Sequence, residues 1–184
     1  MFPSIVVLAV VAAGLLYHPQ VAAGCQEIQN VLLTHYGAPD NDPPGPSIGT
    51  NCFGHDLLAG GTRSGVNSYD MLIILITYFP NVGTGTASDP ITFATADGEF
   101  DNCELVYIPF FQKYFYKGDS CSQCQTDWDN GEWHIDLWTG ATNENGGQTQ
   151  IDCEDSLPGG QQLVVRDPPT NLPVNSTSLI YLVY

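Results

Sequence analysis

The sequence has few basic side chains. It contains 4 lysines and arginines against 20 aspartates and glutamates, which is a net charge of -16 over 184 residues. Nucleic acids and anionic membrane surfaces are bound through positive charge, so we expect neither as a partner. Neutral glycans such as glucan, cellulose and chitin remain compatible with this charge, and peptidoglycan is less favoured because many bacterial walls are anionic. The simpler meaning of the charge is solubility outside the cell.

The sequence also lacks an apolar run of the ~20 residues that cross a bilayer. Its N-terminal run, Ile5–Leu16, is shorter and is followed by a small-residue cleavage site at Val21-Ala22-Ala23. We therefore predict a signal peptide over residues 1–23, although it lacks the usual Lys or Arg; the alternative is a buried N-terminal helix. The protein is then secreted. Residues 24–184 are expected to form a single, monomeric domain of roughly 160 residues, enough for a sizeable core.

All six cysteines follow the predicted cleavage site, and an even number in an exported chain favours disulfides. Our preferred pairing joins Cys25 to Cys52 and Cys103 to Cys153, and leaves Cys121 and Cys124 to pair locally. The count alone permits 15 pairings. A zinc site is the alternative for the Cys-x-x-Cys motif, but no second close pair follows, and we predict no metal and no cofactor. Asn175-Ser176-Thr177 is a predicted acceptor for N-glycosylation.

Regular secondary structure is predicted mainly as short strands between turns rich in Gly, Pro, Asn and Asp. The strand-like runs carry β-branched or aromatic residues and are Leu105–Ile108, Trp133–Thr139, Gln161–Arg166 and Leu179–Tyr184. Two segments are predicted to be helical, Gln26–Thr34 and Pro109–Tyr116. The pattern favours an all-β barrel or sandwich over an α/β fold.

The segment Arg63–Val82 differs from its surroundings. It contains the almost unbroken apolar run Met71–Phe79, inside a stretch rich in Gly, Ser and Thr. We interpret residues 63–82 as an unspliced intron that is translated in frame and has no role in the fold. The alternative is a core strand.

Several short motifs follow one another along the chain. They are Leu33-Thr34-His35-Tyr36-Gly37, Pro39-Asp40-Asn41-Asp42-Pro43-Pro44, Asp89-Pro90-Ile91-Thr92-Phe93-Ala94, Asp119-Ser120-Cys121-Ser122-Gln123-Cys124 and His134-Ile135-Asp136-Leu137-Trp138. The Asp-x-Cys-x-x-Cys motif with the later His-x-Asp-Leu resembles the second half of a double-psi β-barrel. That fold is shared by barwin, expansins, the rare-lipoprotein-A group and family 45 glycoside hydrolases. The whole order also resembles a group of small secreted fungal proteins.

This resemblance implies an all-β, six-stranded double-psi β-barrel with short helical segments, stabilised by disulfides. It also implies that Asp136 lies in an open groove across the barrel. Asp136 matches the aspartate that is the general acid in the hydrolases. Asp119 matches a groove residue that precedes the Cys-x-x-Cys motif. The nearest counterpart of the catalytic base is Asp40, or Asp42. The spacing from Tyr36 to Asp40 differs from that of the hydrolases, which leaves the identity of the base open.

Two carboxylates are the chemistry that inverting cleavage of a glycosidic bond requires. One acid protonates the leaving oxygen and one base activates water, with roughly 6.5–9.5 Å between them. On a strand, alternation places His134, Asp136 and Trp138 on one face and Trp133, Ile135 and Leu137 on the other. An indole can stack on a sugar ring. The predicted substrate-binding residues are His134, Trp138, Tyr36 and Trp133.

Each candidate also has a structural alternative. Asp136 can cap a buried turn, and Asp119 and Asp40 can be turn formers. The predicted function is accordingly a secreted protein that acts on or binds cell-wall polysaccharide, as a glycoside hydrolase or a lytic enzyme. The alternatives are a non-catalytic, expansin-like or barwin-like wall-binding protein, a secreted effector, or a disulfide-stabilised scaffold without such a role.

Overall fold

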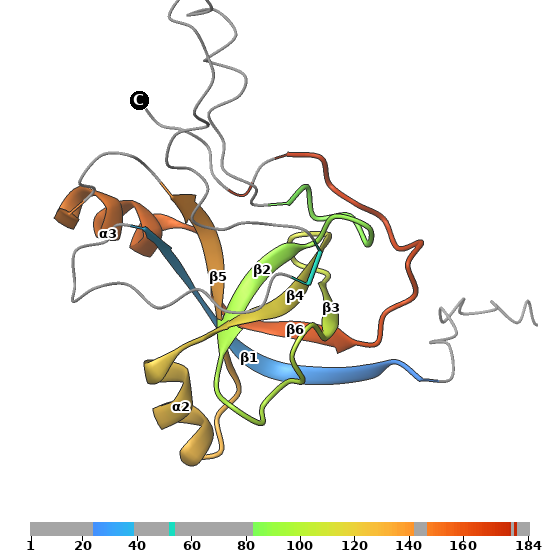
Figure 1. Cartoon of the computed structure of the whole chain (residues 1–184), viewed down its shortest axis with the longest axis horizontal. Coiled ribbons are helices and arrows are strands. Elements are labelled where there is room, and N and C mark those ends of the chain that lie inside the picture. Colours follow the sequence, from blue (N-terminus) through green and yellow to red (C-terminus); the bar gives the residue numbers. More distant parts are fainter. Residues whose placement is uncertain (1–23, 39–51, 54–82, 142–146, 178, 180–184) are drawn as a thin grey trace, which may run out of the picture.

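The computed structural model describes residues 24–38, 52–53, 83–141, 147–177 and 179 (Figure 1). The six strands in this part of the chain are β1 (Gln26–Ala38), β2 (Ile91–Thr95), β3 (Leu105–Ile108), β4 (Lys113–Ser120), β5 (His134–Ala141) and β6 (Gly160–Arg166). Two short helices, α2 (Ser122–Asp129) and α3 (Gly147–Ser156), flank β5 along the chain. The predicted signal peptide, Asp40, Asp42 and the suspected intron at 63–82 lie outside the described residues.

The six strands form a closed barrel in the order β1-β5-β2-β4-β3-β6. β1 pairs in parallel with β5, and β2 pairs in parallel with β4, while the other neighbours are antiparallel. The 13-residue β1 spans the barrel, because its first part pairs with β6 and its second part with β5 (Figure 1). Closure pairs both sides of every described strand, which removes exposed sheet edges. The prediction of an all-β, six-stranded barrel with short helices and disulfides is confirmed.

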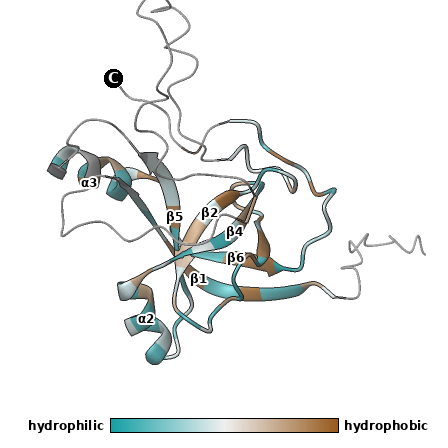
Figure 2. Ribbon diagram, in the orientation of Figure 1, coloured by the Kyte–Doolittle hydropathy of each residue, from teal (hydrophilic) through white to brown (hydrophobic). Residues whose placement is uncertain are grey.

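Alternating side chains on the strands fill the barrel. β1 contributes Val31 and Leu33, and β5 contributes Ile135 and Leu137, all at most 2% exposed. Figure 2 shows brown, hydrophobic stretches along the barrel strands, whereas α2 is largely teal. Full burial of one such side chain contributes about 1.5–3 kcal/mol, so the barrel interior is the main source of stability. The predicted alternation of β5 is thus observed, with Ile135 and Leu137 inside.

A bulge in β1 explains why this segment resembles a helix in the sequence. Ile28 and Val31 are three residues apart, a helical spacing, yet both lie in the core. The pairing register with β6 shifts between them, and Asn30 adopts a positive φ of 60°. An extra residue in one strand lets both side chains face inward, and Asn tolerates the left-handed conformation better than most residues.

Two helix predictions are therefore wrong. Gln26–Thr34 belongs to β1, and Pro109–Tyr116 is a turn followed by the first half of β4. β2, α2 and α3 were not predicted as regular elements. The strand Leu105–Ile108 is confirmed, and Trp133–Thr139 and Gln161–Arg166 match β5 and β6 with small shifts at their ends. Most of Leu179–Tyr184 lies outside the described residues.

The disulfides differ from the preferred pairing. Cys52 pairs with Cys103, and Cys121 pairs with Cys124, while Cys25 and Cys153 are free. Only the local Cys121–Cys124 bond is as predicted; the pairs Cys25–Cys52 and Cys103–Cys153 are wrong. The sulfur of Cys25 donates to the backbone oxygen of Asp167, just beyond β6. Cys153 is exposed on α3, on a different element from Cys103.

The chain after β6 packs over the outer face of the barrel. The hydroxyls of Tyr107 and Tyr114 donate to the backbone oxygens of Pro173 and Pro169. The ammonium group of Lys113 donates to the backbone oxygen of Asn175 at 2.5 Å, and burial lowers the pKa of this lysine. The side chains of Tyr107 and Tyr114, which point outward from β3 and β4, are consequently covered by this segment.

Candidate functional site

Four neighbouring strands align a row of outward-facing residues. In the pairing register, Thr34 of β1 lies opposite Asp136 of β5, Asp136 lies opposite Ala94 of β2, and Ala94 lies opposite Asp119 of β4. We call Thr34, Asp136, Ala94 and Asp119 the carboxylate row. Neighbouring strands are about 4.8 Å apart, so two strand spacings place the backbones of Asp136 and Asp119 about 10 Å apart. Ala94 between them has only a methyl group.

A second bulge turns Asp119 into this row. Phe93 lies opposite Lys117, so unbroken pairing would place Ala94 opposite Gly118 and Asp119 on the core side. Instead the register shifts, and Ala94 lies opposite Asp119. A β-carbon at Gly118 would lie 2.8 Å from side-chain atoms of both Thr92 and Tyr116. Only glycine fits at this point of the strand, and the bulge it permits aims Asp119 outward.

The hydroxyl of Tyr36 is hydrogen-bonded to one of the two carboxylates of the row. It donates to Oδ2 of Asp119 at 3.2 Å, and the ring packs against Trp138 with 5.0 Å between the ring centroids. Burial raises the pKa of Tyr36 well above its usual value, and the negative charges of Asp119 and Asp136 raise it further. The phenol therefore stays protonated at neutral pH and remains a hydrogen-bond donor to Asp119.

Asp119 is nearly enclosed. It is 4% exposed, and its second oxygen, Oδ1, accepts a hydrogen bond from the backbone N–H of Ser120 at 2.8 Å. Both of its oxygens are thus oriented by donors. Asp136 is partly exposed, so it is the more accessible acid of the row.

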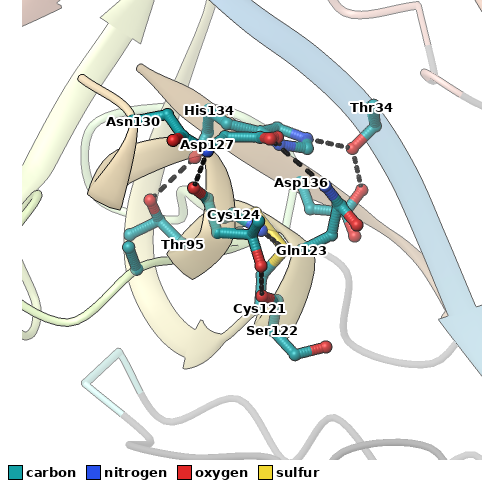
Figure 3. Close-up of polar contacts among 12 residues, drawn as sticks. Thr34, Thr95, Cys121, Ser122, Gln123, Cys124, Asp127, Asn130, His134 and Asp136 are labelled. Atoms are coloured by element: carbon teal, nitrogen blue, oxygen red, sulfur yellow. Dashed lines mark hydrogen bonds and ion pairs between the residues drawn. A yellow bond between two sulfur atoms is a disulfide. The ribbon is translucent and has the colours of Figure 1, made fainter. Parts of the chain in front are cut away.

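A chain of three hydrogen bonds leads away from Asp136 (Figure 3). The hydroxyl of Thr34 lies 2.6 Å from Oδ1 of Asp136 and 2.9 Å from Nε2 of His134. On the other side of the imidazole, Nδ1 lies 2.7 Å from Oδ2 of Asp127 on α2. We call Asp136, Thr34, His134 and Asp127 the relay chain. Oδ1 of Asp127 accepts a further hydrogen bond from Gln123, one turn earlier on α2.

The elements around His134 hold its ring in place. Its backbone N–H donates to Oε1 of Glu99 at 2.7 Å, and its backbone oxygen accepts from the hydroxyl of Thr95 at 2.8 Å. Glu99 is buried, and burial raises the pKa of its carboxyl. Cys121 is the N-cap of α2. Its sulfur accepts from the backbone N–H of Cys124, and the Cys121–Cys124 disulfide closes the first turn of the helix. The start of β5 and the start of α2 are therefore both fixed next to the relay chain.

The predicted substrate-binding aromatics are not open platforms. Trp138 is 1% exposed beneath Tyr36, and Tyr36 is 8% exposed, so neither ring offers a free face to a sugar. Trp133 packs against Phe100 and Trp128 and contacts the barrel core, on the opposite face of β5 from Asp136. These placements correct the expectation that indoles line the site. The side chain of Asn175 is exposed, as an acceptor for glycosylation must be.

The structure thus brings together four of the residues singled out in the sequence: Asp136, Asp119, His134 and Tyr36. Sequence reasoning did not assign a role to Thr34, although it stands in a quoted motif, nor to Asp127 or Glu99. Asp127 reaches His134 only because α2 folds back onto β5, and an aspartate in a short polar helix carries no signal of that contact. The described residues contain no group of three or more His, Cys, Asp or Glu that could hold a metal ion. No helix among them is long and apolar enough to cross a membrane.

Comparison with known proteins places the chain in a family. Residues 28–182 match the family described as the DDB_G0273701 N-terminal domain, so the chain belongs to that family. A protein of Dictyostelium discoideum, named "Uncharacterized protein DDB_G0273701/DDB_G0273221", is 34% identical over 97 residues. That match covers 52% of this chain and 42% of the Dictyostelium protein, less than half of the relative's length. No solved structure gives a significant match.

Proposed function

We propose that this protein is secreted and acts on a neutral polysaccharide of a cell wall, with Asp136 as the general acid. The observation that carries the proposal is the carboxylate row, in which Asp136 of β5 and Asp119 of β4 lie on either side of Ala94 of β2. Backbones about 10 Å apart are compatible with the roughly 6.5–9.5 Å between carboxyl groups that inverting glycosidases use. Peptidoglycan is the least favoured glycan for a chain with a net charge of -16.

The two acids have different surroundings, which suits different roles. Asp136 is the more exposed and is hydrogen-bonded to a hydroxyl that can exchange protons with it, as a general acid requires. Asp119 is the candidate base that activates water, assisted by Tyr36, which orients it. Asp40 is the alternative base and lies outside the described residues.

Secretion is supported by the two disulfides, which persist in oxidising compartments. The barrel and its Cys-x-x-Cys helix support the proposed relationship to barwin-like and expansin-like proteins. Sequencing the N-terminus of protein recovered from the culture medium tests secretion. A mature N-terminus at Gly24 is expected, and retention of the full chain inside the cell would contradict the proposal.

A second candidate is a wall-binding protein that does not cleave glycan, as in expansins, or a secreted effector. The enclosure of Asp119 favours it, because a base with both oxygens hydrogen-bonded and 4% exposure has little room for a water molecule. In that case Asp136 contributes to binding and no bond is broken.

One experiment separates the candidates. Purified protein is incubated with glucan, cellulose, chitin and peptidoglycan, and new reducing ends and bound protein are measured for the wild type, Asp136→Asn and Asp119→Asn. Asp152→Asn, at an exposed position of α3, is the matched control. For the hydrolase we expect Asp136→Asn to lower the rate about 10²- to 10⁴-fold, the usual contribution of a general acid, while binding persists.

The outcomes are distinct. New reducing ends that depend on both Asp136 and Asp119 support the inverting hydrolase. Binding without new reducing ends supports the wall-binding alternative. Cleavage that is unchanged in Asp136→Asn removes this residue from the mechanism. The absence of both binding and cleavage on all four glycans would contradict the proposed function.

A further inference from the structure

The relay chain contains three hydrogen bonds, and each of them needs one proton. The hydroxyl of Thr34 has a single proton, but its oxygen lies within hydrogen-bond distance of both Oδ1 of Asp136 and Nε2 of His134. When Thr34 donates to Asp136, Nε2 must carry a proton and donate to Thr34. When Thr34 donates to His134, Asp136 must be protonated and donate to Thr34.

The third bond fixes the other side of the ring. Nδ1 of His134 and Oδ2 of Asp127 are 2.7 Å apart, and a proton on Nδ1 satisfies this contact in both arrangements. In the first arrangement His134 is positively charged, and Asp136 and Asp127 are ionised. In the second His134 is neutral and Asp136 is protonated. A neutral His134 between two ionised carboxylates would leave one of the three contacts without a proton.

We propose that Thr34 and His134 form a proton relay that delivers a proton to Asp136. The general acid is thus reprotonated from His134, within the protein. This inference rests on the proposed function for its catalytic meaning. The step is balanced: the bond from hydrogen to Nε2 breaks as one forms to Oγ1 of Thr34, and the hydroxyl proton of Thr34 moves to Oδ1 of Asp136. His134 loses its positive charge and Asp136 loses its negative charge, with no net change. Thr34 and His134 are positioning residues, since they act through Asp136.

The surroundings of the relay favour a shared proton. His134 is 3% exposed, and the carboxyl of Asp127 is 18% exposed, so the chain contacts water at Asp127 and at Asp136 but not at the imidazole between them. Among the described residues, the charged and titratable groups that face it are Asp127 from α2, Glu99 from the turn after β2, and Tyr36 and Asp119 next to Asp136. Excluding water from His134 directs its proton through Thr34.

The arrangement also argues against Thr34 as a nucleophile. A hydroxyl, an imidazole and a carboxylate in line are the parts of a hydrolytic triad, and Thr34, His134 and Asp127 meet that description. In a triad, however, the hydroxyl gives its proton to the histidine as it attacks. Asp136 lies 2.6 Å from the same oxygen, and its charge would oppose the negative charge that builds there during attack.

The test is a titration of the whole secreted protein by NMR. The imidazole nitrogens of His134 and the carboxyl carbon of Asp136 are followed from pH 3 to 9 in the wild type, Thr34→Val and Thr34→Ser. From Gly24 onward the histidines are His35, His55 and His134, which keeps the nitrogen spectrum simple. Thr34→Val keeps the shape and the β-branch but removes the hydroxyl, and Thr34→Ser restores it. Thr170→Val, at an exposed position after β6, is the control.

We expect the two wild-type signals to change together with shared midpoints, as in a coupled pair. In Thr34→Val each group should titrate separately, and Thr34→Ser and Thr170→Val should keep the shared midpoints. Independent titration in the wild type, or shared midpoints that survive in Thr34→Val, would overturn the relay. Because this readout does not need a substrate, it stands apart from the glycan screen.

Activity gives a second readout on any glycan that the screen identifies. Thr34→Val is expected to lower kcat about 10- to 100-fold with KM unchanged and to alter the pH profile, whereas Thr34→Ser retains the wild-type profile. Coupled titration without cleavage of any glycan would contradict the proposed hydrolase and leave the proton relay intact. Cleavage with a Thr34→Val profile equal to that of the wild type would contradict the relay alone.

Discussion

His35 shows how burial at one position sets a pH dependence for the whole domain. It follows Thr34 on β1 but points to the other face, where its ring packs edge-on against Phe111 with 6.3 Å between ring centroids. Burial lowers the pKa of His35 from 6.5 to about 4. The folded protein therefore keeps His35 neutral in a range where the unfolded chain binds a proton. This contribution to stability is complete above pH 6.5 and is lost as the pH falls to about 4.

The corresponding prediction concerns His35→Gln, a polar side chain that does not titrate. A full shift of this size would be worth about 3 kcal/mol, and partial contact of the ring with solvent reduces it to roughly 1–2 kcal/mol. We expect the free energy of unfolding in urea to fall less between pH 7 and pH 4.5 in His35→Gln than in the wild type, by that amount. Parallel pH curves for the two proteins would show that His35 is not the group responsible.

At the scale of elements, the bulge in β4 decides whether the carboxylate row exists. Gly118 admits no β-carbon without contacts of 2.8 Å to Thr92 and Tyr116, both buried. We expect Gly118→Ala to lower the free energy of unfolding by about 1–3 kcal/mol, the usual cost of overpacking. It should also weaken the contact between Asp119 and Tyr36, measured as a change in the ultraviolet absorbance titration of tyrosine. Ser120→Ala, an exposed neighbour, should change stability by less than about 0.5 kcal/mol.

At the scale of the whole molecule, the Cys52–Cys103 disulfide connects two distant parts of the chain, 51 residues apart in sequence. Next to Cys52, the ring of Phe53 packs on Tyr116 of β4 with 4.9 Å between centroids, so the bond holds this short segment on the barrel. The loop-entropy relation assigns a loop of this length about 4 kcal/mol and a three-residue separation much less.

We therefore expect the double variant Cys52→Ser, Cys103→Ser to lose about 3–4 kcal/mol of unfolding free energy in urea. The matched control is Cys25→Ser, Cys153→Ser, which removes the two free thiols and should leave stability nearly unchanged. Thiol labelling of the denatured, unreduced protein should modify Cys25 and Cys153 and spare Cys52 and Cys103. Protection of Cys25 and Cys153 from labelling would instead show that the sequence-based pairing, in which all six cysteines are bonded, holds in solution.

Local patterns allowed part of the fold to be predicted. β3, β5 and β6 are recognisable because β-branched and aromatic residues alternate within runs bounded by turns, and β5 shows its inner and outer faces directly. β1 was misread because the bulge at Asn30 lets residues at a helical spacing share the core. The Cys121–Cys124 bond follows from proximity in sequence, whereas the partners of Cys52 and Cys103 depend on how distant segments fold together.

The amino-acid sequence by itself determined the acidic composition and the all-β class, through charge counts and short strand patterns. It also led to the choice of Asp136, Asp119, His134 and Tyr36, through motifs that resemble those of double-psi β-barrels and through the alternation of β5. Only the tertiary structure decided that Asp136 and Asp119 belong to one row, because their strands are neighbours of β2 and a bulge at Gly118 turns Asp119 outward. It also decided that the indole of Trp138 is covered and that Asp127 reaches His134 from α2. Strand register and the return of a helix onto a sheet are set by packing between residues far apart in the chain, and no local pattern records them.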